Sequence, residues 1–146
     1  MAILIDTNVL LRLTQPQHPH CAVAERAIHI LRTRNETLHV TPQNLMEFWA
    51  VATRPADENG LGMTMEIAAA ELAAFRRLFP LLPETASVFQ EWERLVTVHR
   101  VSGKSTHDAH IVAAMRVYGI NTIMTFNVQD FVRYSSISAV HPATVA

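Results

Sequence analysis

The feature of this sequence that most constrains its fold is a short apolar run near its start, Ala2–Ile5, that ends on the acid Asp6. A short run of consecutive apolar residues is typical of a β-strand that is buried on both faces, as in a parallel sheet. An acid directly after such a strand is expected at the carboxyl edge of the sheet, where α/β folds usually bind ligands. Polar groups that follow other strands of the same sheet would then lie beside Asp6.

Length and composition favour one globular domain over residues 1–146. Apolar residues make up 49% of the chain and charged residues 17%, which is typical of a folded chain and not of a disordered one. A net charge of -1 excludes a strong basic field over the whole surface, but a local basic patch suffices to bind phosphates. The single cysteine excludes an intrachain disulfide, and no apolar run reaches the ~18 residues of a membrane span, so we expect a cytoplasmic protein without membrane contact.

Strand and helix patterns alternate along the chain. Strands are predicted at Ala2–Ile5, Thr37–Thr41, Ile120–Thr125 and about Ile137–Val140, with room for a small edge strand at 81–83. Helices are predicted at 8–13, 20–34, 43–53, 65–79, 84–100 and 105–118. The pattern predicts an α/β fold with a central parallel sheet of about four to five strands, sandwiched by helices.

Two further acids stand in or before apolar helical segments. Glu47 is the only charge within residues 45–53, so it must be paired, hydrogen-bonded or metal-bound unless it faces solvent on the outer side of its helix. Asp108 precedes a long apolar segment, and its alternative role is to complete a capping box that begins at Ser105. Both acids are expected near the same edge of the sheet as Asp6.

A fourth polar group follows the third strand, where Asn127 and Asp130 flank the carboxyl end and Phe131 is expected to anchor the loop. An ordinary Asx-type turn would explain the same pattern. If the four acids do converge on one sheet edge, they repel one another and raise one another's pKa values. Hard cations such as Mg²⁺ or Mn²⁺ relieve that repulsion, and a pair of them clamps the attacking and leaving oxygens of a phosphodiester.

The set of motifs resembles a known family. Asp-Thr-Asn-Val-Leu-Leu at 6–11, Glu47 in its apolar helix, Asp108 within 107–114 and the stretch 125–131 resemble, in order and spacing, the four motifs of PIN-domain ribonucleases. They are most similar to VapC-type toxins of bacterial toxin–antitoxin pairs, and the resemblance covers nearly the whole chain. It implies a Mg²⁺- or Mn²⁺-dependent endoribonuclease, inhibited by a small VapB-like antitoxin and usually a homodimer.

The resemblance also implies roles for individual residues. Asp6, Glu47 and Asp108 match the first three acids of the family. Many relatives carry an acid where this sequence has Asn127, so Asp130 is taken as the fourth acid and Asn127 as a neutral ligand or water-holder. On this hypothesis Asp6 and Asp108 bind the main ion, Glu47 and Asp130 complete the cluster, and a metal-bound water attacks the phosphorus.

Six other residues are predicted to contact the substrate. Thr7 or Asn8 would position the attacking water or a phosphate oxygen, and His110 is placed in the substrate groove. The predicted phosphate contacts are Arg12, Lys104 and Arg133, because they are close in sequence to the residues expected at the sheet edge.

Two other functions stay open. A DNA or flap-type nuclease would share the acidic cluster, and comparing the cleavage of single-stranded RNA and DNA would distinguish it. A non-catalytic module with an acidic cleft would bind RNA or a protein partner with metal as a structural part. The asparagine at position 127 gives that second alternative some weight, and turnover measured during a Mn²⁺ titration would decide it.

Overall fold

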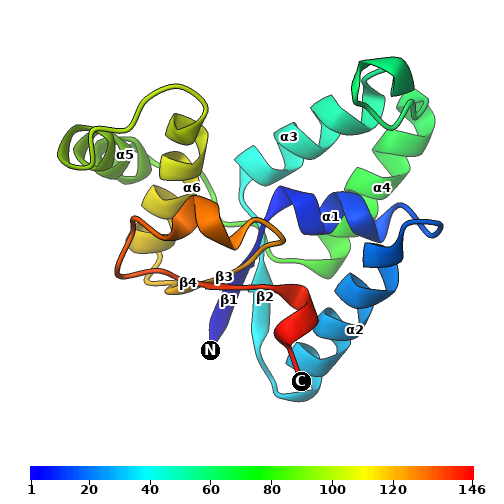
Figure 1. The fold of residues 1–146 in the computed structure, drawn as a ribbon, viewed down its shortest axis with the longest axis horizontal. Coiled ribbons are helices and arrows are strands. Elements are labelled where there is room, and N and C mark those ends of the chain that lie inside the picture. Colours follow the sequence, from blue (N-terminus) through cyan, green and yellow to red (C-terminus); the bar gives the residue numbers. More distant parts are fainter.

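The computed structural model describes residues 1–146 and shows a three-layer α/β sandwich (Figure 1). The middle layer is a wholly parallel sheet in the order β2-β1-β3-β4. Its strands are β1 (Ala2–Ile5), β2 (Thr37–His39), β3 (Thr122–Met124) and β4 (Ser138–Val140). The predicted parallel sheet is confirmed with four strands. The second and third strands are shorter than predicted, and residues 81–83 contribute only an isolated bridge between Leu81 and Val40.

All six predicted helices are present. They are α1 (Thr7–Leu13), α2 (Pro19–Thr33), α3 (Pro42–Thr53), α4 (Met65–Leu78), α5 (Ala86–Val98) and α6 (Ser105–Val117). Three short 3-10 helices are added, η1 (Ala56–Glu58), η2 (Val128–Phe131) and η3 (Pro142–Thr144). None of the helices combines the length and the hydropathy needed to cross a lipid bilayer.

Helix caps explain where α3 begins and why α6 differs from it. The Thr41 hydroxyl accepts from the Asn44 backbone N–H at 3.2 Å, and the Asn44 side chain accepts from the Thr41 backbone N–H at 2.9 Å. This reciprocal pair satisfies two otherwise unpaired donors at the helix start. Helix α6 has no side-chain cap, so the alternative role of Asp108 in a capping box is not seen.

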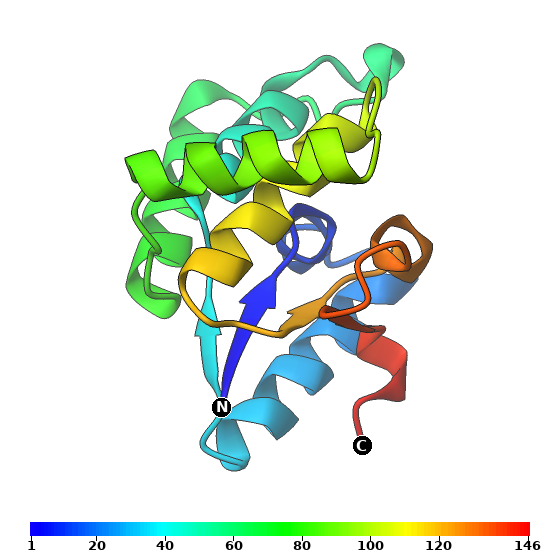
Figure 2. The same cartoon turned by 90° about the vertical axis from the view of Figure 1, so that its left-hand side faces the viewer.

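The sheet separates two hydrophobic cores, as the alternation of β1 side chains requires. Ile3 and Ile5 are buried with side chains of α1, α2, α3 and α4 on one face. Leu4 is buried with side chains of α5 and α6 on the other face. Figure 2 shows helices α5 and α6 lying together on that side of the sheet. The carboxyl ends of β1 and β3 therefore open between two helical layers, where α1, α3 and α6 begin.

Candidate functional site

Asp6 both ends β1 and caps α1. Its Oδ1 accepts from the Thr7 backbone N–H at 2.8 Å, and its Oδ2 accepts from the Thr125 hydroxyl at 2.7 Å. The pKa of Asp6 is raised from 3.8 to about 6. Burial is the largest cause, and the charges of Glu47 and Asp130 act in the same direction. The hydrogen bonds from Thr125 and Thr7 act in the opposite direction, so they stabilise the ionised carboxylate in a site that disfavours charge.

Thr125 is a functional candidate that the sequence analysis missed. It is fully buried, and besides donating to Asp6 its hydroxyl accepts from Asn8 Nδ2 at 3.1 Å and from the Asn127 backbone N–H at 3.0 Å. Ile5 pairs with Met124 in the sheet, so the residues that follow these two strands lie side by side. A polar residue directly after the third apolar run was the signal available in the sequence.

Asn8 joins the same two strand ends. Its Nδ2 lies 3.1 Å from Thr125 Oγ1 and 3.4 Å from Asp6 Oδ2, while its Oδ1 accepts from the Phe126 backbone N–H at 3.1 Å. Both ends of the amide are therefore used within the protein. These hydrogen bonds fix the orientation of Asn8 in the lining of the cleft. That Thr7 or Asn8 positions the attacking water or a phosphate oxygen stays a prediction.

Glu47 on α3 is held by hydrogen bonds at both carboxylate oxygens. The hydroxyl of Thr7 donates to Oε2 at 3.1 Å, and the side-chain amide of Gln43 donates to Oε1 at 2.7 Å. Thr7 is buried and also receives a hydrogen bond from Asn44 Nδ2 at 3.3 Å. Thr7 thus supports Glu47 from inside the protein, and Glu47 does not lie on the outer face of its helix.

Asp108 and Asp130 close the other side of the cluster. Asp108 lies in the first turn of α6, and its pKa is raised from 3.8 to about 7. Burial is the largest cause, the charges of Asp130, Asp6 and Glu47 act in the same direction, and the charge of Arg133 acts against them. Asp130 is exposed in η2, and the next residue, Phe131, is 1% exposed and anchors the turn in the core, as expected.

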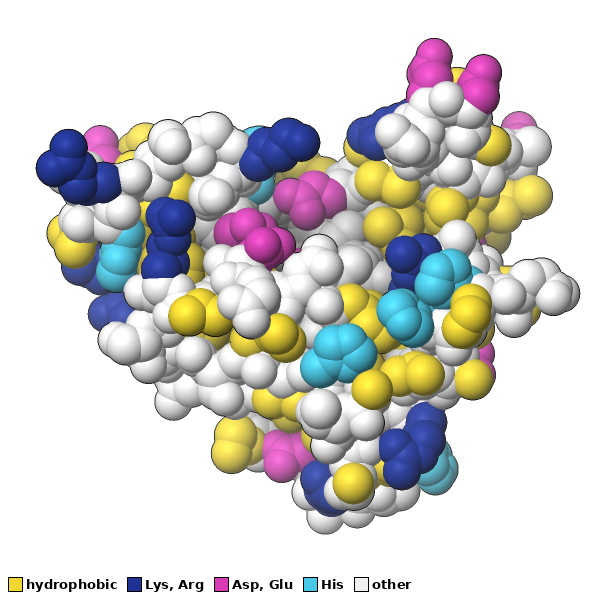
Figure 3. Space-filling model, in the orientation of Figure 1, with side chains coloured by type: hydrophobic (Ala, Val, Ile, Leu, Met, Phe, Trp, Pro, Cys, Tyr) yellow, Lys and Arg dark blue, Asp and Glu magenta, His cyan; other side chains and the backbone are white.

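These acids line one cleft with a volume of about 320 Å³. Acidic side chains gather in the hollow at the centre of the face shown in Figure 3, with Lys and Arg side chains around it. Asn127 and Asp130 both contribute to the lining, so the structure does not select one of them. The polar lining comprises Asp6, Thr7, Asn8, Glu47, Arg54, Asp108, Asn127 and Asp130.

The cation that lines this acidic cleft is Arg54, which the sequence analysis missed. Arg54 follows Glu47 by seven residues, about two helical turns, and lies directly after Thr53, the last residue of α3. This spacing was the available signal. The three predicted cations, Arg12, Lys104 and Arg133, are not among the lining residues. Arg12 instead donates to Gln15 Oε1 at 2.8 Å, and Arg133 acts on the cleft through its charge near Asp108.

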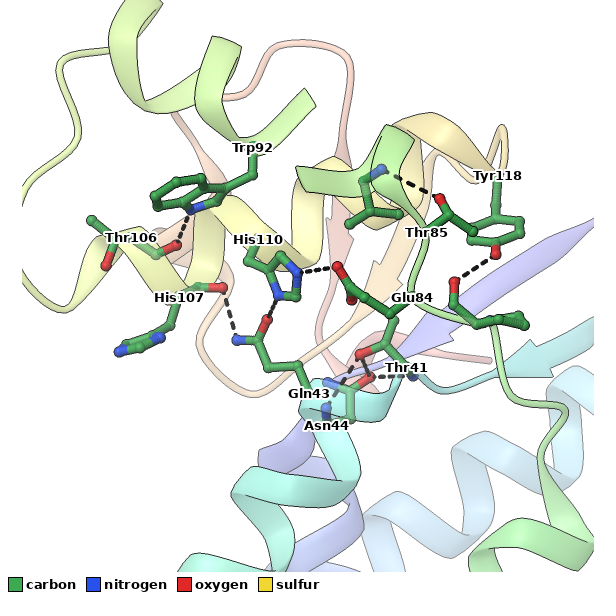
Figure 4. A network of polar contacts seen from close by, with 12 residues as sticks. Thr41, Gln43, Asn44, Glu84, Thr85, Trp92, Thr106, His107, His110 and Tyr118 are labelled. Atoms are coloured by element: carbon green, nitrogen blue, oxygen red, sulfur yellow. Dashed lines mark hydrogen bonds and ion pairs between the residues drawn. The ribbon is translucent and has the colours of Figure 1, made fainter. Parts of the chain in front are cut away.

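A second pocket of about 430 Å³, here called the side pocket, lies beside the acidic cleft. His110 lines this side pocket and not the acidic cleft. Its Nδ1 contacts the side-chain oxygen Oε1 of Gln43, and its Nε2 lies 2.9 Å from Glu84 Oε1 (Figure 4). Gln43 also donates to the His107 carbonyl at 2.9 Å. The side pocket is lined by Pro42, Gln43, Met46, Glu84, Phe89, Trp92, Thr106, His107 and His110.

Gln43 therefore lies between the two cavities. The sequence analysis did not identify this residue. Its amide nitrogen binds Glu47 in the acidic cleft, and its carbonyl oxygen contacts His110 in the side pocket. The spacing of four residues between Gln43 and Glu47 places both side chains on one face of α3. That spacing was the signal in the sequence.

The donor set of the acidic cleft suits a hard divalent cation. Carboxylate and amide oxygens are the preferred ligands of Mg²⁺ and Mn²⁺. Burial, and after it the charges of the neighbouring acids, raise the pKa values of Asp6 and Asp108. A bound cation relieves the repulsion between these charges. As the side chains stand, no group of three or more Asp, Glu, His or Cys residues closes around a single point, so the ligand set is open.

A three-layer α/β fold with acids gathered at the carboxyl edge of its parallel sheet defines the class of this protein. The PIN domain family model matches residues 3–136, and the chain belongs to this family. No curated protein sequence matches the chain.

Solved structures of the same fold come from bacterial toxin–antitoxin systems. VapBC2 from Rickettsia felis, bound to a DNA fragment from its promoter, has a chain with a TM-score of 0.75 and 15% identity, and the match covers 97% of this chain and 98% of that one. A chain of VapBC-1 from nontypeable Haemophilus influenzae has a TM-score of 0.71 and 16% identity, and the match covers 99% of this chain and 100% of that one. VapC20 from Mycobacterium tuberculosis, a Sarcin-Ricin loop cleaving toxin, has a TM-score of 0.66 and 23% identity, and the match covers 90% of this chain and 95% of that one. At these identities the similarity establishes the shared fold.

Proposed function

We propose that this protein is a metal-dependent endoribonuclease and acts as the toxin of a VapBC-type pair. The observation that carries the proposal is the acidic cleft, in which Asp6, Glu47, Asp108 and Asp130 meet from four separate segments of the chain. A protein does not keep several partly buried carboxylates together for stability, because each raises the cost of ionising the others. Membership of the PIN family supports a nuclease, and the RNA-cleaving VapC20 shares the fold.

In this proposal Asp6 and Asp108 hold the main ion, Glu47 and Asp130 complete the cluster, and Asn127 is a neutral ligand. A bound Mg²⁺ or Mn²⁺ supplies Lewis-acid activation of the phosphodiester and of the attacking water. The protein's own part is orientation. Thr125 holds the Asp6 carboxylate, and Thr7 and Gln43 hold the two oxygens of Glu47.

Arg54 is the phosphate contact that the geometry favours, because it lines the acidic cleft. A guanidinium in this position binds a phosphate oxygen of the RNA backbone and orients the scissile bond toward the acids. Arg133 lies close enough to oppose the raised pKa of Asp108, so it is a second candidate on the opposite side. Arg12 and Lys104 are outside this arrangement.

The test compares cleavage of a single-stranded RNA and a DNA of the same sequence, with Mg²⁺, with Mn²⁺ and with chelator. We expect RNA cleavage that needs the cation and that Asp108→Asn abolishes. The matched control is Asp57→Asn, because Asp57 is exposed in η1, away from the cleft. Equal cleavage of DNA would favour the flap-type nuclease, and metal-dependent RNA binding without turnover would favour the non-catalytic module.

We further propose a small VapB-like protein as the inhibitor and a homodimer as the working form. The support is the set of similar structures, which are toxin–antitoxin complexes. Co-expression with the product of an adjacent small gene is expected to yield a stable complex that lacks RNA cleavage. Light scattering of the isolated protein is expected to give twice the mass of one chain, and a monomer that cleaves RNA would exclude the dimer.

A further inference from the structure

We propose that the side pocket binds one unpaired base of the RNA substrate and that it prefers guanine. This inference rests on the proposed ribonuclease function and names a part of the substrate that the acidic cleft does not hold. The side pocket is a separate cavity of about 430 Å³, within the size range of small-molecule sites.

The position of the side pocket makes it reachable from the acidic cleft. Gln43 contributes to the wall of the side pocket, and Glu47 lies one helical turn further along α3, a step of about 5.4 Å. On the other side, His107 lines the side pocket and its neighbour in sequence, Asp108, lines the acidic cleft. A nucleotide whose phosphate lies at the acids therefore has an adjacent base at the mouth of the side pocket.

Two aromatic rings on α5 provide a stacking surface. The side chain of Phe89 is 56% exposed, and its ring centroid lies 5.6 Å from that of Trp92 at an interplanar angle of 35°. The indole N–H of Trp92 already donates to the Thr106 carbonyl at 2.9 Å, which fixes the ring (Figure 4). Fixed, partly exposed aromatic rings beside a phosphate-binding region are the usual platform for unpaired bases.

Glu84 provides the discrimination between bases. Its Oε1 faces His110 Nε2 at 2.9 Å, while its Oε2 receives no hydrogen bond from the protein. A free carboxylate oxygen accepts from N–H groups. Guanine presents the adjacent N1–H and N2–H₂ donors on its Watson–Crick edge, whereas uracil presents one N–H between two carbonyl oxygens that the carboxylate repels.

A second copy of this chain is the competing occupant, because Met46 and Phe89 are exposed apolar side chains near the pocket. The lining favours a base. Pro42, Met46, Phe89 and Trp92 give the side pocket a mostly apolar surface, and Glu84, His107 and His110 place charged or hydrogen-bonding groups beside it. The central part of a protein interface is depleted of charged groups such as Glu84. An apolar, partly aromatic surface with hydrogen-bonding groups beside it matches a flat heterocycle with a hydrogen-bonding edge.

The first experiment measures kcat/KM on single-stranded RNAs that differ only in the base beside the scissile bond. The variants are Phe89→Ala, with Val98→Ala as control, because Val98 is 61% exposed on the same helix and outside the pocket. We expect guanine to be preferred, and Phe89→Ala to lower kcat/KM at least about fivefold while Val98→Ala does not. Equal rates for all four bases would overturn the proposal.

A second pair of variants tests the hydrogen-bonding edge. Glu84→Gln is expected to reduce the preference for guanine, while Glu93→Gln, an exposed position on α5, preserves it. If Glu84→Gln leaves the guanine preference unchanged, Glu84 does not read the base and the proposal fails in that part. If Phe89→Ala converts a dimer to a monomer in light scattering without changing base preference, the pocket is a contact between copies and the proposal is wrong.

A binding measurement separates this inference from the proposed function. The chain has two tryptophans, so Trp49→Phe leaves Trp92 as the only indole. Titration with short guanine-rich and uracil-rich RNAs in chelator, where no cleavage occurs, is expected to quench Trp92 fluorescence more strongly with guanine. Quenching in a protein that never cleaves RNA would refute the nuclease and support the pocket. RNA cleavage without any quenching of Trp92 would support the nuclease and refute the base-binding pocket.

Discussion

The hydroxyl of Thr125 donates to Asp6 Oδ2 at 2.7 Å and so ties the residue after β3 to the residue after β1. Thr125 is fully buried, whereas Asp6 is partly exposed to the acidic cleft. The hydrogen bond lowers the pKa of Asp6 in a place where burial raises it. One buried hydroxyl therefore orients the first acid and favours its ionised form.

Replacing this hydroxyl tests its role. Thr125→Val keeps the shape of the side chain but leaves Asp6 Oδ2, Asn8 and the Asn127 N–H with one partner fewer. We expect a loss of about 1–2 kcal/mol of stability and a roughly 10- to 100-fold fall in cleavage, because the carboxylate is no longer held. Thr125→Ser restores the hydroxyl and should recover most of the activity in a cleavage assay. Loss of activity in both variants alike would show that packing matters and the hydrogen bond does not.

The acidic cluster should be more stable without one of its charges. Asp108→Asn removes the carboxylate whose pKa is raised to about 7 by burial and by three neighbouring acids. In the presence of chelator we expect its melting temperature to rise by roughly 2–4 °C, which corresponds to about 1 kcal/mol. Saturating Mg²⁺ should stabilise the wild type and not the variant. A lower melting temperature for Asp108→Asn in chelator would contradict the repulsion described for the cleft.

The stability of the metal-free protein should depend on pH in a definite direction. The folded pKa values of Asp6 and Asp108, about 6 and about 7, lie above the ordinary value of 3.8. Between pH 4 and 7 the folded state therefore binds more protons than the unfolded state, and these groups contribute stability that is lost as pH rises. Partly buried His39, whose pKa is lowered by burial, contributes the opposite slope.

The difference between wild type and Asp108→Asn isolates the contribution of the acid. Urea unfolding in chelator, repeated in steps from pH 4.5 to pH 7.5, is expected to show the variant gaining stability relative to wild type as pH rises. A constant difference across this range would mean that the folded pKa of Asp108 is not raised.

Gln43 is a positioning residue for Glu47, because its amide donates to Glu47 Oε1 at 2.7 Å from one turn away. Gln43→Met keeps the length of the side chain without the donor. We expect the Mg²⁺ concentration for half-maximal cleavage to rise roughly tenfold, as for other groups that orient a metal ligand. Gln90→Met on the exposed face of α5 is the matched control. An unchanged Mg²⁺ requirement with merely lower stability would assign Gln43 a structural role.

Arg54 should act on substrate binding and not on the chemical step. Arg54→Ala removes the cation that lines the acidic cleft, so we expect KM to rise several-fold and the slope of log KM against log salt to fall by about one. Arg77→Ala, at an exposed position of α4, provides the control. If Arg12→Ala has the larger effect on KM, the RNA follows a path other than the one described.

Local sequence patterns predicted most of the secondary structure. Apolar runs predicted all four strands, and helical patterns predicted all six helices, because these signals depend on neighbouring residues. The same reasoning placed Asp6 and the third strand's polar loop at one sheet edge, since parallel strands share a direction. The strand ends differ by one or two residues because the sheet pairs only where a partner strand continues.

Sequence patterns predicted fewer of the side-chain contacts within the site. Arg12 is near Asp6 in sequence but binds Gln15, whereas Arg54 is distant in sequence and reaches the cleft along α3. The placement of His110 in a separate pocket depends on how α6 packs against Gln43 and Glu84. Such contacts are set by the packing of elements far apart in the chain, and no local spacing encodes them.

The four acids differ in the kind of structure that carries them. Asp6 ends a strand, Glu47 and Asp108 stand on helices, and Asp130 stands alone on the exposed turn η2, with Phe131 as its anchor. Exchanges and insertions in such a turn disturb little of the core, whereas the other three positions also serve a cap or a helix face. The turn at 127–130 is therefore the part of the cluster in which substitutions disturb the rest of the protein least.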